Sequence, residues 1–243
     1  MKSFLKKIYF FGYKYKCNVC NKSFRKFKVG GLKNKIFTDL SIIGGGYRSN
    51  YRCPHCGSND RIRLVYYFLQ NKINFENINK ILHVAPEEKI ENYLKKFNVE
   101  YSSLDVNSKN VTFTEDITNL SLEDQSYDFV ICNHVLEHVS NDIKAIEEIY
   151  RILKKGGRAV IQVPISLKLD ETLEQESHWS DEQREKYFGQ HDHVRLHGRD
   201  FPSRLASAGF VVDTYKWWHD ESSKLLDKFG FTMNEKIFLC KKI

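Results

Sequence analysis

The sequence predicts an α/β protein in which a Rossmann-like, doubly wound sheet follows a small cysteine-rich module. From residue 61 onward, apolar segments with strand spacing alternate with segments of helical spacing, which is typical of a mostly parallel sheet covered on both faces. The first 60 residues instead contain two closely spaced cysteine pairs. The two parts also differ in net charge. We therefore predict two domains, residues 1–60 and residues 61–243.

The composition is that of a globular chain. With 243 residues, 41% of them hydrophobic and 28% charged, the chain is long enough for one core and a small appendage. No stretch approaches the roughly 20 apolar residues of a membrane helix. The basic N-terminal segment has an apolar patch, IYFFGY, that is too short and too aromatic for a signal peptide. We expect a cytoplasmic protein with no membrane span and with reduced cysteines.

Basic residues are concentrated near the N-terminus. Residues 1–70 contain 15 Lys and Arg against Asp39 and Asp60, a net charge of +13, whereas the remainder has a net charge of −6. A positive surface attracts nucleic acid, phosphorylated substrates or anionic lipid. A solvated face of a lysine-rich protein explains the same pattern equally well, so charge alone does not identify a partner.

Four of the six cysteines form two CxxC pairs, Cys17/Cys20 and Cys53/Cys56. Each pair can direct two thiolates at one ion, and together they complete a tetrahedral zinc site. The residue after each pair is Asn or Gly, the types that best tolerate a positive φ. Four thiolates leave no open position, so we predict a structural zinc in a zinc-ribbon-like module. Redox-active cysteines and a chance arrangement are the alternatives.

The predicted elements follow in order along the rest of the chain. Seven segments have strand patterns and define the predicted sheet: residues 80–85, 100–105, 111–114, 127–133, 157–164, 210–216 and 235–241. Helical spacing is found over residues 61–72, 86–97, 135–154 and 198–208. Only a loop joins the last two strands, so we expect them to pair antiparallel and to give one antiparallel edge strand. Cys132 and Cys240 lie in strand segments and are expected to be buried thiols.

Polar residues follow the carboxyl ends of the first four predicted strands, where an open α/β sheet binds ligands. Asp105 lies about 20 residues after the first turn, the position of an acid that binds ribose hydroxyls. Asp116 offers an acceptor for an adenine amino group, and Ile117 offers an apolar surface for the ring. The fourth strand ends at Asn133-His134. A single acid after a strand is more often a turn residue, so the prediction depends on the combination.

The segments YDFVICNHVLEHV (127–139), AIEEIYRILKKGGRAVIQVP (145–164) and RDFPSRLASAGF (199–210) resemble class I S-adenosylmethionine-dependent methyltransferases of the type-11 group. The resemblance covers residues 78–243. HVAPE (83–87), FGQHDHVRLHGRD (188–200) and the cysteine module are similar to a narrower bacterial group, often encoded among surface-polysaccharide genes. The resemblance implies S-adenosylmethionine as cofactor and methyl transfer as activity.

The glycine-rich first turn of this family is replaced here by His83-Val-Ala85-Pro86-Glu87. Glycines allow close approach to a pyrophosphate, but S-adenosylmethionine has no phosphate, and Glu87 can pair with its ammonium group. Pro86 suits a first helical position. Predicted cofactor contacts come from His83, Ala85, Pro86, Glu87, Asp105, Asp116, Ile117, Asn133 and His134. The alternative is that the turn has lost the cofactor and that the chain is a non-catalytic binding or assembly module.

Two groups of residues are candidates for chemistry at the acceptor. His191, His193, Arg195 and His197 alternate, so in an extended segment they share one side. The candidate catalytic residues His191, His193 and Arg195 then supply a base and a clamp for an anionic or sugar acceptor; a polar loop that stabilises itself through Asp192 is the alternative. His134, Glu137 and His138 share one face of the predicted helix. A related spacing binds a divalent metal in ubiquinone-pathway O-methyltransferases and in enzymes that methylate small-RNA 3′ ends. They have Glu where this chain has His134, and we favour a structural role.

The leading functional hypothesis is a methyltransferase that O-methylates a small or glycan-type acceptor related to surface polysaccharide or nucleotide sugars. An RNA methyltransferase that grips phosphates with its basic module is the second hypothesis. The basic module favours RNA, and the absence of a clear aromatic RNA-binding motif disfavours it. The sequence does not indicate the oligomeric state.

Overall fold

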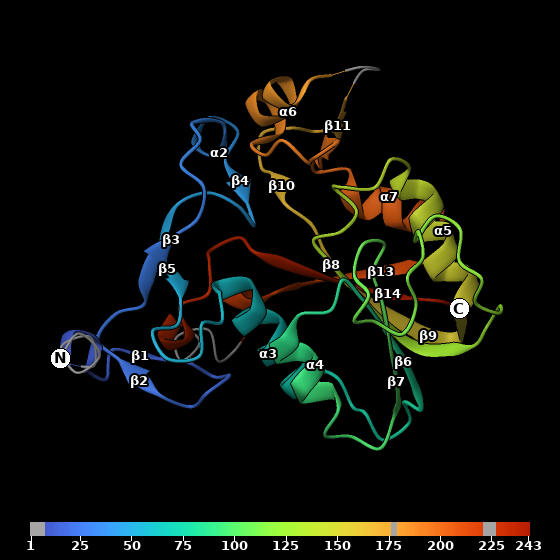
Figure 1. Cartoon of the computed structure of the whole chain (residues 1–243), viewed down its shortest axis with the longest axis horizontal. Coiled ribbons are helices and arrows are strands. Elements are labelled where there is room, and N and C mark those ends of the chain that lie inside the picture. The colour runs from blue at the N-terminus through green and yellow to red at the C-terminus, as the bar shows by residue number, and fades with distance from the viewer. Residues whose placement is uncertain (1–7, 176–178, 221–226) are drawn as a thin grey trace.

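The computed structural model describes residues 8–175, 179–220 and 227–243; the other residues of the predicted cysteine module, 1–7, lie outside this description. A six-stranded sheet forms the centre of the fold (Figure 1), in the order β13-β14-β9-β8-β6-β7. Its strands are β6 (Lys80–Val84), β7 (Glu100–Leu104), β8 (Tyr127–Asn133), β9 (Leu153–Gln162), β13 (Val211–Lys216) and β14 (Lys236–Lys241).

The sheet is mostly parallel, as predicted. Strands β7, β6, β8 and β9 are parallel neighbours, and β14 pairs antiparallel with both β9 and β13. The predicted antiparallel pairing of the last two strands at one edge of the sheet is confirmed. The antiparallel strand itself, β14, is not the outermost strand as predicted, because it inserts between β9 and β13. Seven strands were also predicted, but residues 111–114 contribute only one bridge, from Phe113 to Leu104. The hydroxyls of Ser103 and Thr112 accept each other's backbone N–H, in place of a regular ladder.

Helices cover both faces of the sheet, which confirms the doubly wound architecture. Helices α3 (Asp60–Lys72) and α4 (Glu88–Leu94) lie on one face, and α5 (Asp142–Ile152) and α7 (Phe201–Ser207) lie on the other (Figure 1). Side chains of β8 alternate between the two cores: Phe129 and Ile131 pack with α3 and α4, whereas Val130 and Cys132 pack with α5 and α7. Cys132 and Cys240 are fully buried, as expected.

Three of the predicted helices, α4, α5 and α7, begin later than expected; α7 begins at Phe201 instead of residue 198. Helix α5 begins at Asp142, where the side chain of Asn141 accepts the N–H of Lys144 as an N-cap. Residues 134–141 therefore form a turn, and the prediction that His134, Glu137 and His138 share a helix face was wrong. Helix α4 begins at Glu88 with Glu87 as its N-cap, so Pro86 precedes the helix instead of occupying its first position.

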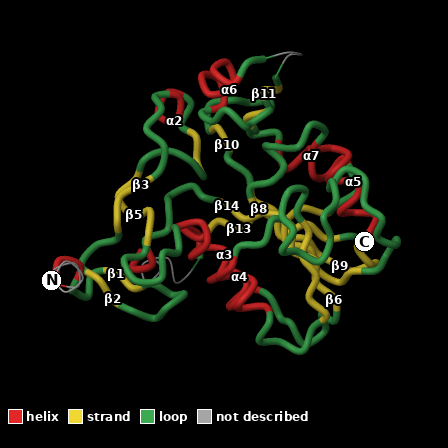
Figure 2. The backbone as a smooth tube through the Cα atoms, viewed as in Figure 1, coloured by secondary structure: helices red, strands yellow, loops and turns green. Residues whose placement is uncertain are grey.

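The N-terminal module consists of short strands joined by loops (Figure 2). Its strands are β1 (Tyr15–Lys16), β2 (Ser23–Phe24), β3 (Lys28–Gly30), β4 (Ile42–Ile43) and β5 (Arg48–Arg52), with the short helix α2 (Ile36–Asp39). Pairs β1–β2 and β3–β5 surround the cysteines, whereas β4 pairs with β10 (Ile165–Ser166), which follows β9. The module is thus joined to the carboxyl end of the central sheet.

The remaining elements are β11 (Leu173–Glu174), α6 (Asp181–Phe188), β12 (Arg195–Leu196) and the 3-10 turns η1 (Trp217–His219) and η2 (Asp227–Phe229). Strands β11 and β12 pair with each other. Among the described residues, no helix combines the length and the apolar composition needed to cross a bilayer.

Buried charged side chains connect the module to the sheet domain. Arg63 of α3 is fully buried and donates to the carbonyls of Asn50 and Ser58 in the module and of Phe229 and Gly230 in the C-terminal segment. Arg48 of β5 forms a two-pronged ion pair with Asp60. The module is therefore packed against the sheet domain and not tethered to it by a free linker.

Candidate cofactor site and cysteine cluster

A pocket of about 430 Å³ lies at the carboxyl ends of β6, β7 and β8. Its volume is within the range of small-molecule sites, and its position is where an open α/β sheet binds ligands. Its lining residues come from the ends of these strands and the following loops: Val84, Ala85, Leu104, Asp105, Val106, Asn107, Glu115, Asp116, Ile117, His134, Val135, His138, Val139 and Ser140.

The turn after β6 contains no glycine, and its residue Ala85 lines the pocket. Ala85 has a φ of 46°, and its N–H donates to the carbonyl of Leu104 over 2.8 Å. The buried ring of His83 donates from Nε2 to Glu87 (2.7 Å), so that Nδ1 accepts from the hydroxyl of Tyr101 (3.1 Å). Burial raises the pKa of Tyr101, which keeps this donor protonated. His83 and Glu87 thus stabilise the turn without lining the pocket.

The two predicted carboxylates both line the pocket and both shape their own loops. Asp105 Oδ1 accepts the N–H groups of Asn107 (2.8 Å) and Ser108 (2.9 Å). Asp116 Oδ1 accepts the N–H and the hydroxyl of Thr118, at 2.8 and 2.9 Å. Each acid uses one carboxylate oxygen in these turn contacts. Asp105 and Asp116 therefore stabilise their own turns and line the pocket at the same time.

His134 lies where β8 enters the turn, with a φ of 54°. Its Nδ1 is 3.3 Å from Oε1 of Glu137. Burial, together with the positive charge of Arg61, lowers the pKa of His134. Burial alone would raise the pKa of Glu137, but the hydrogen bond from His134 and the neighbouring imidazoles outweigh it and lower that pKa. At neutral pH the pair is therefore a neutral imidazole beside a carboxylate.

The structure places the predicted cofactor residues in two sets. Ala85, Asp105, Asp116, Ile117 and His134 line the pocket, whereas His83, Pro86, Glu87 and Asn133 do not. Val106 also lines the pocket, although the residue is 58% exposed and was not predicted from the sequence. An apolar residue directly after a strand-terminal acid was the available signal. The sequence reasoning also missed Val139 and Ser140, because they were assigned to a helix interior.

The predicted catalytic loop does not present its polar residues on one side. His191 is exposed, whereas His193 and Arg195 are 1% and 2% exposed. Only Arg195 and Leu196 form strand in this segment, so the alternation expected of an extended segment is interrupted. The Arg195 guanidinium donates to the carbonyls of Leu136, Val139 and Ser140. These contacts give Arg195 a role in holding the turn between β8 and α5.

Unpartnered polar atoms gather at the carboxyl ends of β8 and β9. Asn133 and Gln162 are register partners, and buried side-chain atoms of both have no hydrogen-bond partner among the described residues. Glu235, just before β14, also has a buried oxygen to which no described residue donates. Burial and the charge of Asp60 raise the pKa of Glu235 to about 7. A Cβ placed on Gly44 would lie 3.2 Å from His134 and 3.4 Å from Glu235, so the N-terminal module closes over this region.

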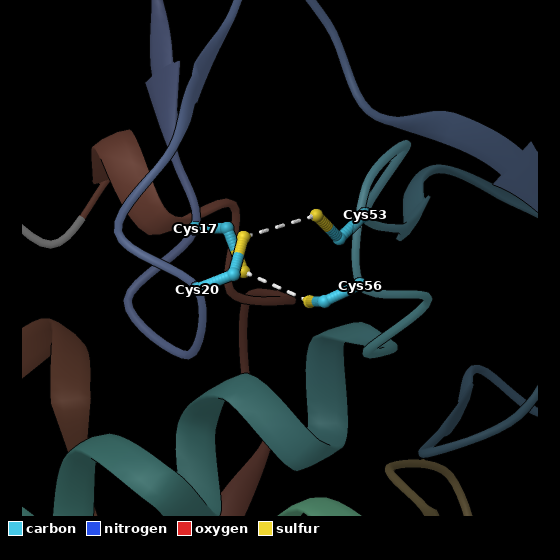
Figure 3. A group of neighbouring side chains, drawn as sticks. All are labelled: Cys17, Cys20, Cys53 and Cys56. Atoms are coloured by element: carbon cyan, nitrogen blue, oxygen red, sulfur yellow. Dashed lines mark hydrogen bonds between the residues drawn. The ribbon is translucent and has the colours of Figure 1, made fainter.

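The four cysteines of the CxxC pairs converge in the N-terminal module (Figure 3). Cys17 Sγ is 3.7 Å from Cys56 Sγ, and Cys20 Sγ is 3.8 Å from Cys53 Sγ. Zinc–sulfur bonds of about 2.3 Å in a tetrahedron place sulfur atoms roughly 3.8 Å apart. Asn21 and Gly57, directly after the pairs, have φ values of 61° and 78°, as the sequence predicted. The cluster therefore fits a four-thiolate zinc ion in donor type and spacing.

Known sequences are similar to the part of the chain that contains β6, β7 and β8. Residues 81–161 match the family model of a methyltransferase domain. An uncharacterised protein of Methanocaldococcus jannaschii is 37% identical over 78 residues, which are 30% of this chain and 34% of that protein. Arsenite methyltransferase of Mus musculus is 30% identical over 95 residues, which are 35% of this chain and 23% of that enzyme. The chain thus spans about a third or less of these curated relatives.

Solved structures share the fold. A SAM-dependent methyltransferase from Archaeoglobus fulgidus has a TM-score of 0.50 and 16% identity, covering 76% of this chain and 95% of that chain. A methyltransferase from Mesorhizobium loti, also dependent on S-adenosylmethionine, has a TM-score of 0.51 and 10% identity, covering 73% and 97%. The central domain therefore has the Rossmann-like α/β fold of these methyltransferases.

Proposed function

We propose that the chain is an S-adenosylmethionine-dependent methyltransferase. The observation that carries the proposal is the pocket at the carboxyl ends of β6, β7 and β8, lined by Asp105 and Asp116. Asp105 provides an acceptor for ribose hydroxyls, and Asp116 an acceptor for the adenine amino group. The exposed apolar side chain of Val106 and the buried Ile117 give the adenine ring a surface to pack on. The methyltransferase-domain match over residues 81–161 supports this proposal.

The turn after β6 suits a cofactor without phosphate. In this turn Ala85 lines the pocket. The side chain of Glu87 is 24% exposed, and one of its oxygens is hydrogen-bonded to His83. A methionyl ammonium needs an acceptor, not a glycine-rich phosphate cradle. Glu87 does not itself line the pocket, and we assign its second carboxylate oxygen to the ammonium end of the cofactor, beside the lining residue Ala85.

We propose that the acceptor is a small or glycan-type molecule methylated on oxygen. The unpartnered atoms of Asn133, Gln162 and Glu235 support a polar, hydroxyl-bearing acceptor, because buried polar groups are normally hydrogen-bonded. The N-terminal module, which we assign a structural zinc, closes this side through Gly44. The reduced thiols of such a zinc site fit a cytoplasmic protein. RNA is the competing acceptor, which the +13 charge of residues 1–70 favours.

Titration of the zinc-loaded protein with S-adenosylhomocysteine tests the cofactor assignment. We expect binding that Asp105→Ala weakens tenfold or more, because the variant loses both the ribose acceptor and the bonds to Asn107 and Ser108. Asp105→Asn keeps an oxygen for those two N–H groups but lacks the charge. It should retain the fold and bind with intermediate affinity. If the intact, folded protein does not bind S-adenosylhomocysteine, the chain is a non-catalytic module.

A further inference from the structure

Three potential metal ligands meet beside the cofactor pocket, although they come from different parts of the chain. Glu137 and His138 belong to the turn between β8 and α5, whereas His193 belongs to the loop after α6. One ligand atom from each side chain lies within 4.8 Å of the others. The His138 and His193 rings are 4.7 Å apart at 88°. Two imidazoles and a carboxylate form a donor set typical of catalytic sites for divalent transition metals.

Each of the three side chains keeps one ligand atom available. His138 Nδ1 donates to the carbonyl of Asp192 over 3.1 Å, which leaves the lone pair on Nε2. Glu137 Oε1 is engaged by His134, while Oε2 is buried and has no partner among the described residues. His193 Nδ1 is likewise buried without a partner in the described part of the chain. Two buried polar atoms without a partner at one point offer acceptors for a shared ligand.

Neighbouring groups orient these ligands as the outer contacts of a metal site do. The Gln190 side-chain nitrogen lies 2.7 Å from Nε2 of His193. Rotating the amide by 180° exchanges its nitrogen and oxygen, and the oxygen then accepts Nε2–H and leaves the lone pair of His193 on Nδ1. His134 fixes the Glu137 carboxylate, and the Val194 N–H donates to the Glu137 carbonyl over 2.9 Å. Ligand atoms on one ion lie roughly 3.4 Å apart. Small side-chain rotations are therefore enough to bring the three ligand atoms from within 4.8 Å of one another to this separation.

We infer that Glu137, His138 and His193 bind a divalent transition-metal ion that holds the oxygen of the methyl acceptor. His138 and His134 line the cofactor pocket, so an open coordination position next to them adjoins the site of the transferable methyl group. A metal-bound hydroxyl loses its proton more readily. Its proton passes to water, the oxygen forms a bond to the methyl carbon, and the carbon–sulfur bond breaks to leave neutral S-adenosylhomocysteine. This role rests on the proposed methyl transfer, whereas metal binding itself does not.

Titration of the zinc-loaded full chain with Co²⁺, followed by calorimetry and visible absorption, tests the site. Because zinc already occupies the four cysteines, Co²⁺ can bind only at other side chains. Its spectrum should therefore lack thiolate charge-transfer bands. We expect one Co²⁺ per chain. His193→Ala and Glu137→Gln should each weaken its binding tenfold or more. His191→Ala, from the same loop but exposed, should bind Co²⁺ as the intact protein does.

The same samples are titrated with S-adenosylhomocysteine to separate the possible failures. Neither Glu137 nor His193 lines the pocket, so retained binding by either variant shows that its loss of Co²⁺ is not misfolding. If the intact protein binds S-adenosylhomocysteine but no Co²⁺, the metal site is refuted and the proposed function stands. Equal Co²⁺ affinity in the intact protein and both variants also refutes the assignment. Failure to bind S-adenosylhomocysteine, with Co²⁺ bound as expected, removes the methyltransferase role and leaves the metal site.

Discussion

Ala85 and His134 occupy left-handed backbone conformations at the ends of the neighbouring strands β6 and β8, with φ values of 46° and 54°. Such conformations are uncommon for residues other than glycine and cluster at functional sites. Both residues line the pocket. The sequence identified both positions from their place after a strand, but it contained no signal for the strained backbone. Surrounding contacts impose that backbone, including the bonds from Ala85 to Leu104 and from His134 to Gln162.

His197 is a residue whose charge state should control stability. It is fully buried, its ring packs on Phe201 at 4.5 Å, and neither ring nitrogen has a hydrogen bond among the described residues. Burial lowers its pKa to about 4. In the unfolded chain the pKa is higher, so the unfolded state binds more protons between pH 6.5 and pH 4. Stability is therefore complete above this window and falls as the pH is lowered through it.

Urea unfolding at pH 7 and pH 5 measures this contribution. Between these pH values, the free energy of unfolding should fall about 2 kcal/mol more in the intact protein than in His197→Phe, which has no proton to take up. His191→Phe, at an exposed position of the same segment, should retain the full pH dependence. Identical pH dependence in the intact protein and His197→Phe would show that the buried ring is not held neutral.

At the scale of elements, the turn between β8 and α5 departs most from expectation. Helical spacing from residue 135 predicted a continuous helix, yet α5 begins at Asp142. The carbonyls of Leu136, Val139 and Ser140 instead accept hydrogen bonds from Arg195, which is 59, 56 and 55 residues away in sequence. A distant buried guanidinium therefore overrides local helical propensity. Periodicity alone could not reveal this contact.

Arg195→Lys tests how much this turn depends on the guanidinium. Lysine keeps the charge but cannot reach three carbonyls with a planar fork, so buried acceptors lose their donors. We expect a loss of about 2–4 kcal/mol in the free energy of unfolding, measured by urea denaturation. Weaker binding of S-adenosylhomocysteine should accompany it, because Val139 and Ser140 line the pocket.

Arg199→Lys is the matched control for this substitution. Arg199 is 56% exposed and pairs with the exposed Asp170 at 2.8 Å. An exposed pair contributes little, so the variant should stay within about 0.5 kcal/mol of the intact protein. Equal effects at positions 195 and 199 would contradict the structural role of Arg195.

At the scale of the whole molecule, the N-terminal module is packed against the sheet domain. The ring of Phe27 packs under Arg63 at 4.0 Å, and Asn50 donates to the carbonyl of Gly230. Part of the basic charge of residues 1–70 is thereby used internally, since Arg48 pairs with Asp60 and Arg63 is buried. This internal use weakens the case for a surface that exists to bind nucleic acid.

Substitution of a cysteine in the cluster should affect the module and the zinc together. Metal analysis of Cys53→Ser should find no zinc. Trypsin should cleave this variant faster at the basic residues of the module, and the variant should unfold at a lower temperature. Cys240→Ser is the comparison: Cys240 is buried in β14, so this variant should lose stability while retaining zinc. Retention of one zinc per chain by Cys53→Ser would refute the four-cysteine site.

The sequence alone determined the Rossmann-like fold, the two cysteine pairs and the strand ends that line the pocket, because these follow from local periodicity and short spacing. Asp105, Asp116 and Ile117 were found for this reason. Only the tertiary structure decided that β14 inserts beside β9, that residues 111–114 form no ladder strand, and that His193 meets Glu137 and His138. These outcomes depend on contacts between residues tens of positions apart. Such contacts arise from packing and buried hydrogen bonds, which a one-dimensional pattern does not encode locally.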